Sequence, residues 1–203
     1  MISMTPEKAY KLSKYDRSPK LKSIVCNSPY LAYKYARYRD IRPSNMTRNA
    51  ACEDPEYAYL YAKYVDKKSR KQTRESASNN AMYAYKYAID IDKRNNKVTR
   101  EGVAQEASWA YLYARHVDKK PHPMTRKAVL QNPSTAYAYA QLFSNKFFAD
   151  IKEVACQNPQ YAFLYAKNID KGPSDQTWDA VVGSKYEKEY KKFLNLLEKD
   201  TII

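Results

Sequence analysis

The side chains of this sequence that could do chemistry are cations placed at a constant interval. Three successive clusters follow an Asp in the chain: Lys67, Lys68, Arg70 and Lys71, then Lys93, Arg94 and Lys97, then Lys119 and Lys120. Each cluster begins 26 residues after the one before it. The sequence as a whole carries 36 Lys and Arg against 22 Asp and Glu, a formal net charge of +14. Cations repeated along one edge of a protein are suited to holding a polyanion.

A second cationic series has the same interval. It consists of Arg48, Arg74, Arg100 and Arg126, with Lys152 at the next place, and it accompanies the aspartates Asp40, Asp66, Asp92, Asp118 and Asp170. An Asp in the last turn of a helix opposes the helix dipole, so the arginines are expected to compensate it in a structural ladder. The fifth repeat agrees, because Ser144 replaces Asp where Lys152 replaces Arg. The sixth repeat does not, because Asp170 stays where Trp178 replaces Arg. The alternative is a row of guanidinium groups that grip successive phosphates.

The sequence lacks the arrangements that carry catalysis or metal binding. It contains no Ser-His-Asp pattern, no glycine-rich phosphate loop and no Cys-x-x-Cys pair. Its two histidines, His116 and His122, are far from any nucleophile pattern. Cys26, Cys52 and Cys156 occupy the same repeat position, which we interpret as a small apolar slot in a buried helix. We therefore expect a protein that is not an enzyme, with no catalytic residue, no cofactor and no metal.

The elements that position the cations follow from a repeat of 26 residues between Pro29 and Ser184. Each unit reads Pro, two variable residues, Ala-Tyr, one variable residue, Tyr-Ala, two variable residues, an apolar residue, Asp and Lys, followed by a polar loop and Thr-Arg. Pairs such as Asn132-Pro133 predict a capped helix start, and the alanines and tyrosines predict a helix of about 11 residues. A threonine such as Thr47 or Thr73 is expected to cap a second helix of about 8 residues. Each unit is thus a predicted helical hairpin.

This periodicity predicts an all-α fold, a right-handed α-solenoid of about six to seven 26-residue helical hairpins with a C-terminal capping helix. The expected parts are a degenerate N-terminal capping repeat at 1–28, six repeats at 29–184 and an amphipathic capping helix at 185–203. The alternative for that last helix is a membrane-surface or partner-binding role, because lysines face away from its apolar side.

No membrane span is expected, since no apolar stretch approaches the roughly 18 residues that a span needs. The N-terminal residues also lack an apolar core of signal-peptide length. We therefore expect a cytoplasmic location.

The unit Tyr57-Ala58-Tyr59-Leu60-Tyr61-Ala62 resembles the short Ala/Tyr-rich helical tandem repeats of bacteriophages and large DNA viruses. The resemblance covers residues 29 to 171 best. In that family a Lys-Gly-Arg loop follows the Ala-Tyr-x-Tyr-Ala unit, whereas Lys171-Gly172 is the nearest match in this sequence. The resemblance implies an α-solenoid of viral origin, and hence the host cytoplasm as its location. It implies no catalytic residue, because the family is mostly without an assigned function.

Two functions fit these observations. The first is a non-enzymatic basic solenoid that binds a polyanion, nucleic acid without sequence specificity, through the Lys/Arg-rich loop edge. The alternative is a viral protein-interaction scaffold that binds and inhibits an acidic host defence protein, since solenoids present extended docking surfaces.

Overall fold

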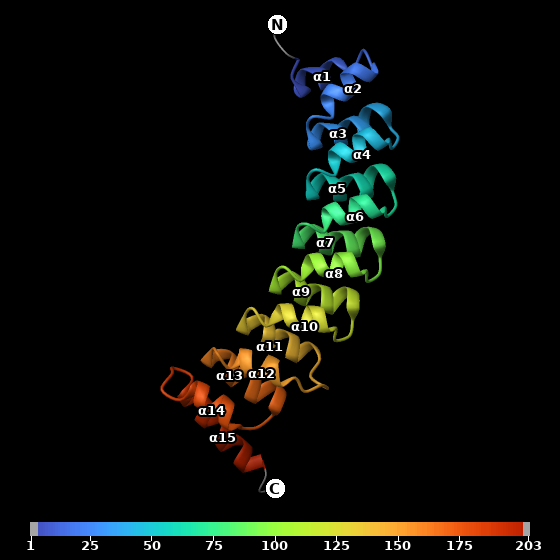
Figure 1. Cartoon of the computed structure of the whole chain (residues 1–203). Helices are drawn as coiled ribbons and strands as arrows, with labels where there is room; N and C mark the ends of the chain where they lie inside the picture. The colour runs from blue at the N-terminus through green and yellow to red at the C-terminus, as the bar shows by residue number, and fades with distance from the viewer. Residues whose placement is uncertain (1–3, 201–203) are drawn as a thin grey trace. The chain divides into compact units, whose positions relative to one another are not determined.

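The computed structural model describes residues 4–200, with side chains described as far as residue 198. Within that range the chain is helical and has no strand, as expected for an all-α fold. The predicted cap at 1–28 begins with residues 1–3, and the predicted helix at 185–203 ends with residues 201–203; these two ends lie outside the described residues. The chain divides into two compact units, Met1–Gln105 and Glu106–Ile203 (Figure 1).

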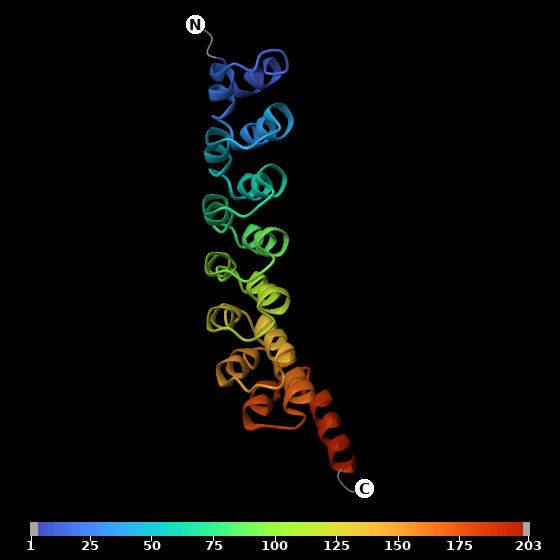
Figure 2. The same ribbon diagram turned by 90° about the vertical axis from the view of Figure 1, so that its right-hand side faces the viewer.

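The first unit is built from pairs of helices in which each helix contacts the next. Its elements are α1 (Pro6–Leu12), α2 (Pro19–Val25), α3 (Pro29–Tyr35), η1 (Ala36–Asp40), α4 (Asn45–Ala51), α5 (Pro55–Tyr61), η2 (Ala62–Asp66), α6 (Lys71–Ala77), α7 (Ala81–Tyr87), η3 (Ala88–Asp92) and α8 (Lys97–Val103). Successive pairs also touch, because α3 contacts α5 and α5 contacts α7. Figure 2 looks along these helices and shows them in two columns.

The second unit repeats this plan. Its elements are α9 (Ala107–Tyr113), η4 (Ala114–Asp118), α10 (Pro123–Val129), α11 (Pro133–Leu142), α12 (Ala149–Ala155), α13 (Pro159–Tyr165), η5 (Ala166–Asp170), α14 (Asp175–Val181) and α15 (Glu187–Asp200). The helix pairs α9–α10, α11–α12 and α13–α14 are in contact, and α11 also contacts α9 and α13. The apolar side of α15 packs against the last hairpin through Tyr190 and Phe193.

First helices that follow an Asp-Pro or Asn-Pro pair begin as the sequence predicts. The Asp54 carboxylate accepts the backbone N–H groups of Glu56 and Tyr57, and Pro55 occupies the first helical position. Asn132 caps α11 in the same way by accepting the N–H of Ser134. A side-chain acceptor satisfies a donor that has no partner inside the helix, and proline there sacrifices no bond.

The ends of these helices hold a feature that the sequence did not predict. After seven α-helical residues the chain widens into a five-residue π-helical segment, as in η2, and the following residue is left-handed. Lys67, Lys93, Lys119 and Lys171 take this conformation with φ between 52° and 55°. In the hairpin where Ser144 replaces the recurring Asp, α11 has no π segment and Phe143 has a φ of −120°. The π segment, the left-handed residue and the Asp thus occur together.

The second helices begin three residues earlier than expected. The predicted cap Thr47 lies inside α4, whose actual cap is Ser44, and Thr73 lies inside α6, which follows Arg70. These threonines are fully buried and hydrogen-bond to tyrosines of the next hairpin, which explains why they recur. The expectation that they cap the second helix was therefore wrong.

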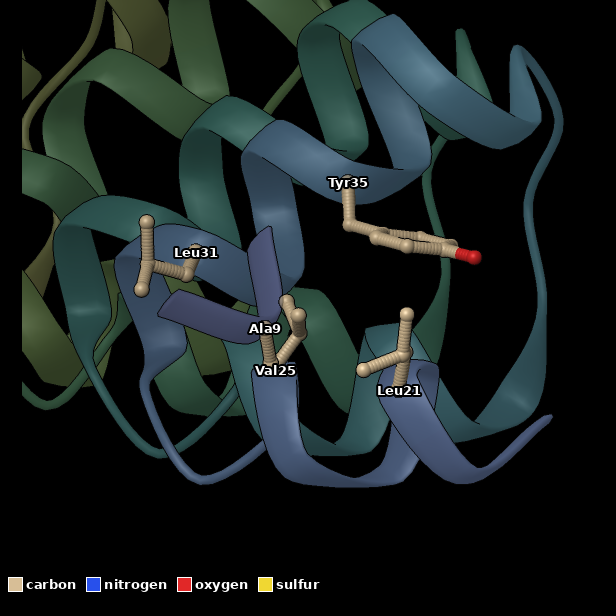
Figure 3. Close-up of a cluster of buried hydrophobic side chains, with 5 residues drawn as sticks. All are labelled: Ala9, Leu21, Val25, Leu31 and Tyr35. Carbon is tan, nitrogen blue, oxygen red and sulfur yellow. The ribbon is translucent and has the colours of Figure 1, made fainter. Parts of the chain in front are cut away.

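Small and aromatic side chains alternate in the core. Alanines one helical turn apart on the first helices, such as Ala58 and Ala62, have no exposed surface, so neighbouring backbones approach closely. Tyr35, Tyr61 and Tyr87 are also fully buried. Figure 3 shows the corresponding cluster at the N-terminal end, formed by Ala9, Leu21, Val25, Leu31 and Tyr35.

The hydroxyl groups of the buried tyrosine column bond across to the preceding hairpin. The Tyr61 hydroxyl lies 2.8 Å from Thr47 Oγ1 and accepts the Ser44 N–H at 3.0 Å. Tyr87 repeats this with Thr73 at 2.8 Å and the Arg70 N–H at 3.1 Å. These bonds satisfy a buried hydroxyl and a helix-cap N–H together, so the column joins the hairpins as well as filling space.

The three cysteines stand at the ends of second helices and are half-buried rather than fully buried. Burial raises the pKa of Cys26 and Cys156 to about 11 and that of Cys52 to about 12.

Among the described helices, none combines the length and the apolar character needed to cross a bilayer.

Candidate nucleic-acid interface

Ion pairs join successive hairpins. Arg48 on α4 donates from Nε and Nη2 to the two carboxylate oxygens of Asp66, at 2.9 and 2.7 Å. Arg74 on α6 binds Asp92 in the same bidentate way, with both distances 2.8 Å. The side chains of Asp66 and Asp92 are only 0% and 2% exposed. The hydrogen bonds that Arg48 donates to Asp66 raise the pKa of Arg48, so the guanidinium is charged in the fold.

Lysines take the place of the pairing arginine in other hairpins of the two compact units. Lys22 pairs with Asp40 in the first unit, and Lys152 pairs with Asp170 at 2.8 Å in the second. Each cation is the equivalent of Arg48, and each aspartate is the equivalent of Asp66. In these two hairpin pairs the cation position keeps its charge although lysine replaces arginine.

Of the other two arginines of the predicted ladder, Arg126 is more exposed than Arg48 and Arg74. Arg126 has Ser144 at the place of its aspartate and lies instead 3.3 Å from Asp150, with both side chains about two-fifths exposed. Arg100 lies on α8 and is half-buried.

The aspartate partner belongs to the next hairpin, 18 residues later in the chain, and not to the same repeat. The expectation that each arginine compensates the Asp of its own repeat was therefore wrong. Asp170 pairs with Lys152 of the preceding hairpin. The replacement of Arg by Trp178 in the repeat of Asp170 therefore leaves that ion pair intact. Arg48 and Arg74 are engaged inside the protein, so they do not form a row of phosphate-gripping groups.

The predicted loop cations lie at the exposed ends of the hairpins. Lys67, Lys68, Lys93 and Arg94 are exposed in the first unit, and no ion pair with them is found among the described residues. Figure 1 shows the loops that carry them, between α5 and α6 and between α7 and α8, on one side of that unit. Lys119 and Lys120 are exposed at the equivalent loop of the second unit.

The other three predicted cations have carboxylates nearby. Arg70 Nε lies 3.2 Å from Asp66, which Arg48 already holds. Lys71 and Lys97 lie 3.9 and 3.8 Å from glutamates one helical turn further on, in exposed pairs that contribute little. These three are therefore weaker candidates for binding an anion than the loop residues before them.

Two neighbouring hollows open beside the loops of the first unit. The first is lined by Ala62, Lys63, Lys67, Lys68, Ser69, Asp90, Ile91 and Lys93. The second is lined by Ala36, Arg37, Tyr38, Ile41, Tyr64, Val65 and Lys67. Lys67 belongs to both, so a lysine-rich hollow adjoins one that combines an arginine with aromatic and aliphatic side chains.

Arg37 is held among tyrosines in the second hollow. Its guanidinium carbon lies 4.1 Å from the ring centre of Tyr64 and 5.1 Å from that of Tyr38. It also donates to the Tyr33 hydroxyl, and this hydrogen bond raises the pKa of Arg37. Cation–π contacts of this kind fix the guanidinium without neutralising it. The positive charge of Arg37 is therefore available to a bound anion.

Lys63 is bound to a carboxylate at the edge of the first hollow. Its ammonium lies 2.7 Å from Asp90 and 2.8 Å from the Tyr59 hydroxyl, and these hydrogen bonds raise the pKa of Lys63. Burial raises the pKa of Asp90, but the hydrogen bonds from Lys63 and Tyr59 outweigh burial and leave that pKa below its usual value. Lys63 is thus partly compensated, and the net positive charge of this hollow comes from the loop lysines.

Sequence reasoning missed Arg37, Tyr38 and Tyr64 as site residues. The signal was present, because a cation followed by tyrosine recurs as Arg37-Tyr38 and Lys63-Tyr64. The following hairpin has Asp90 at the place of these tyrosines. The cation–tyrosine pair therefore occurs in two hairpins and is not part of the general repeat pattern.

Among the residues that the structure describes, no group of three or more His, Cys, Asp or Glu side chains could hold a metal ion. Comparison with protein-family models, with curated proteins and with solved structures finds no match to this chain.

Proposed function

We propose that this protein is a non-enzymatic, right-handed α-solenoid of six to seven 26-residue hairpins that binds nucleic acid without sequence preference through its loop cations. One observation carries the proposal. Asp66 and Asp92, which precede the loop lysines directly in sequence, are buried against Arg48 and Arg74. The nearest carboxylates in sequence are therefore withdrawn from the loops, whose cations stay exposed.

The electrostatics support a polyanion as the partner. The net charge of +14 attracts nucleic acid over distances longer than a direct contact. Each cation that meets a duplex phosphate releases counterions and adds about −0.9 to the slope of log K against log salt. The loops place lysine and arginine side chains at the surface, which suits phosphate contacts rather than base reading.

The experiment replaces Lys67, Lys68, Lys93 and Arg94 together by alanine and measures binding of fluorescent DNA and RNA by anisotropy across a salt series. We expect the salt slope to fall by roughly 3 to 4 and the low-salt affinity to drop strongly. The matched control replaces four exposed lysines that lie on helices, Lys11, Lys20, Lys188 and Lys192, and so removes the same charge. An equal loss in both variants, or no binding by the wild type at low salt, would refute the proposal.

An acidic host protein is the second candidate partner. Exposed apolar side chains favour it, because Ile41 and Phe147 are 78% and 72% exposed in loops that also carry cations. In that case the wild type binds neither DNA nor RNA, but it retains an acidic protein from nuclease-treated lysate. The alanine variant of the four loop cations should then lose that protein.

A further inference from the structure

The aromatic hollow beside the loops holds tyrosines that are packed differently from those of the buried column. Tyr38 and Tyr64 are 51% and 40% exposed, whereas the tyrosines of the buried column, such as Tyr61, are fully enclosed. Ile41, in the same hollow, is still more exposed. The next hairpin has Asp90 at the position of Tyr64, so packing between hairpins does not require an aromatic ring there.

The contacts of Arg37 keep this hollow in one arrangement. The guanidinium lies against the rings of Tyr38 and Tyr64 and is tied by its hydrogen bond to the Tyr33 hydroxyl. A guanidinium plane and tyrosine rings are the flat surfaces on which unpaired bases stack in proteins that bind single strands. The bases of a duplex are already stacked on each other, so a duplex gains nothing from these rings.

The neighbouring hollow supplies the other half of a nucleotide site. Lys67 lines both hollows, and Lys68 and Lys93 line the lysine-rich one. A base and its phosphate are joined by a single sugar, so a flat aromatic surface directly beside a cluster of ammonium groups matches the two parts of one nucleotide. Among the described residues that line the two hollows, Asp90 is the one carboxylate, and it is bound to Lys63.

From this juxtaposition we infer that the nucleic acid bound by the first unit is single-stranded, with unpaired bases on Tyr38, Tyr64 and Arg37 and phosphates at Lys67, Lys68 and Lys93. The inference rests on the proposed function and narrows its substrate class. It predicts that single strands bind more tightly than duplexes of the same sequence at the same salt concentration.

The test compares a single-stranded oligonucleotide, its duplex and an abasic strand of equal length. Replacing Tyr38 and Tyr64 by serine should weaken single-strand binding by roughly tenfold or more for each stacked base. It should leave duplex binding unchanged, and the abasic strand should bind the wild type as weakly as the intact strand binds the variant. The control variant Tyr15→Ser, at an exposed tyrosine outside the hollow, should bind like the wild type.

The outcomes separate this inference from the proposal on which it rests. Equal binding of strand and duplex, both unaffected by the serine substitutions, overturns the inference and leaves the proposed function standing. No binding of any probe at low salt overturns both. If the double serine variant loses helical circular dichroism, Tyr38→Leu with Tyr64→Leu keeps the apolar bulk and removes the flat ring. Retained single-strand preference in that leucine variant also overturns the inference.

Discussion

Removal of one hydroxyl group from the buried tyrosine column should have different consequences at two equivalent places. At Tyr61 the hydroxyl accepts the Ser44 N–H at 3.0 Å and bonds to Thr47 at 2.8 Å. At Tyr35 the hydroxyl is buried and has no hydrogen-bond partner among the described residues. The two rings are otherwise alike, since both are fully buried at the same place in their hairpins.

The sequence explains why the Tyr35 hydroxyl has no hydrogen-bond partner among the described residues. The place of Thr47 is taken by Leu21, which lies beside the Tyr35 ring (Figure 3). The place of the Ser44 N–H is taken by the Ser18 N–H, which donates instead to Asp16 at 2.9 Å. Both partners of the hydroxyl are thus lost together in the hairpin at the N-terminal end.

Tyr61→Phe should destabilise the protein by about 1–3 kcal/mol, because it leaves the Ser44 N–H without its acceptor. Tyr35→Phe should be neutral or stabilise by up to about 1 kcal/mol, because it removes a hydroxyl that already lacks a partner. In a chain of this size each kcal/mol moves the melting temperature by about 2–4 °C. Thermal and urea denaturation followed by circular dichroism measure the difference between the variants.

Hydrogen exchange gives a local measurement for the same pair, since an array of hairpins need not unfold in one step. The Ser44 amide should exchange faster in Tyr61→Phe and at the wild-type rate in Tyr35→Phe. In a Leu21→Thr background, which supplies the missing hydroxyl, Tyr35→Phe should become costly in a double-mutant cycle. The reasoning is refuted if Tyr35→Phe alone destabilises as much as Tyr61→Phe.

Three further predictions concern close packing, thiol reactivity and pH. Gly102→Ala should destabilise by about 1–3 kcal/mol on denaturation, because the added Cβ would lie 2.5 Å from the Ser78 carbonyl oxygen, whereas Gly172→Ala, which meets open space, should change little. Cys52, with its pKa raised to about 12, should react with iodoacetamide at pH 8 on the order of a thousandfold more slowly than an ordinary thiol until urea unfolds the chain. The pKa of Asp90 is lowered in the fold, so its stabilisation is present above the unfolded pKa and disappears as the pH falls through the folded one; the difference in melting temperature between wild type and Asp90→Asn should therefore narrow below about pH 4.

The helical pairing and the first-helix caps could be predicted because they depend on short-range chemistry. A cap such as Asp54 followed by Pro55 acts within one turn, and the alanines and tyrosines mark one side of one helix. The second-helix caps vary from Ser44 to Arg70 to His122, so the recurring threonine was the stronger signal and was assigned the wrong role. Its real partner is a tyrosine in another hairpin, which a search for local caps does not reveal.

The candidate site was predicted only in part, for a related reason. The loop cations recur with the period, so their exposed edge could be predicted from spacing. The partner of each ladder arginine depends on how hairpins stack, and Arg48 reaches forward to Asp66 in the next one. The hollow around Arg37 belongs to two adjacent hairpins and therefore cannot be derived from an average repeat.

The second unit also has buried tyrosine hydroxyls, among them that of Tyr190 on α15, which lies 2.8 Å from Thr177 Oγ1 as the Tyr61 hydroxyl lies from Thr47 Oγ1. Helix α15 thus packs on the last hairpin through the same tyrosine–threonine contact that joins one hairpin to the next. Junctions that keep the threonine are interchangeable, so loss or duplication of one 26-residue block between two of them would bring an equivalent threonine and tyrosine together at the new boundary. Leu21 and Ile151 take the place of the threonine at two other junctions. Proteins with this construction can change length in whole steps without redesign of their ends.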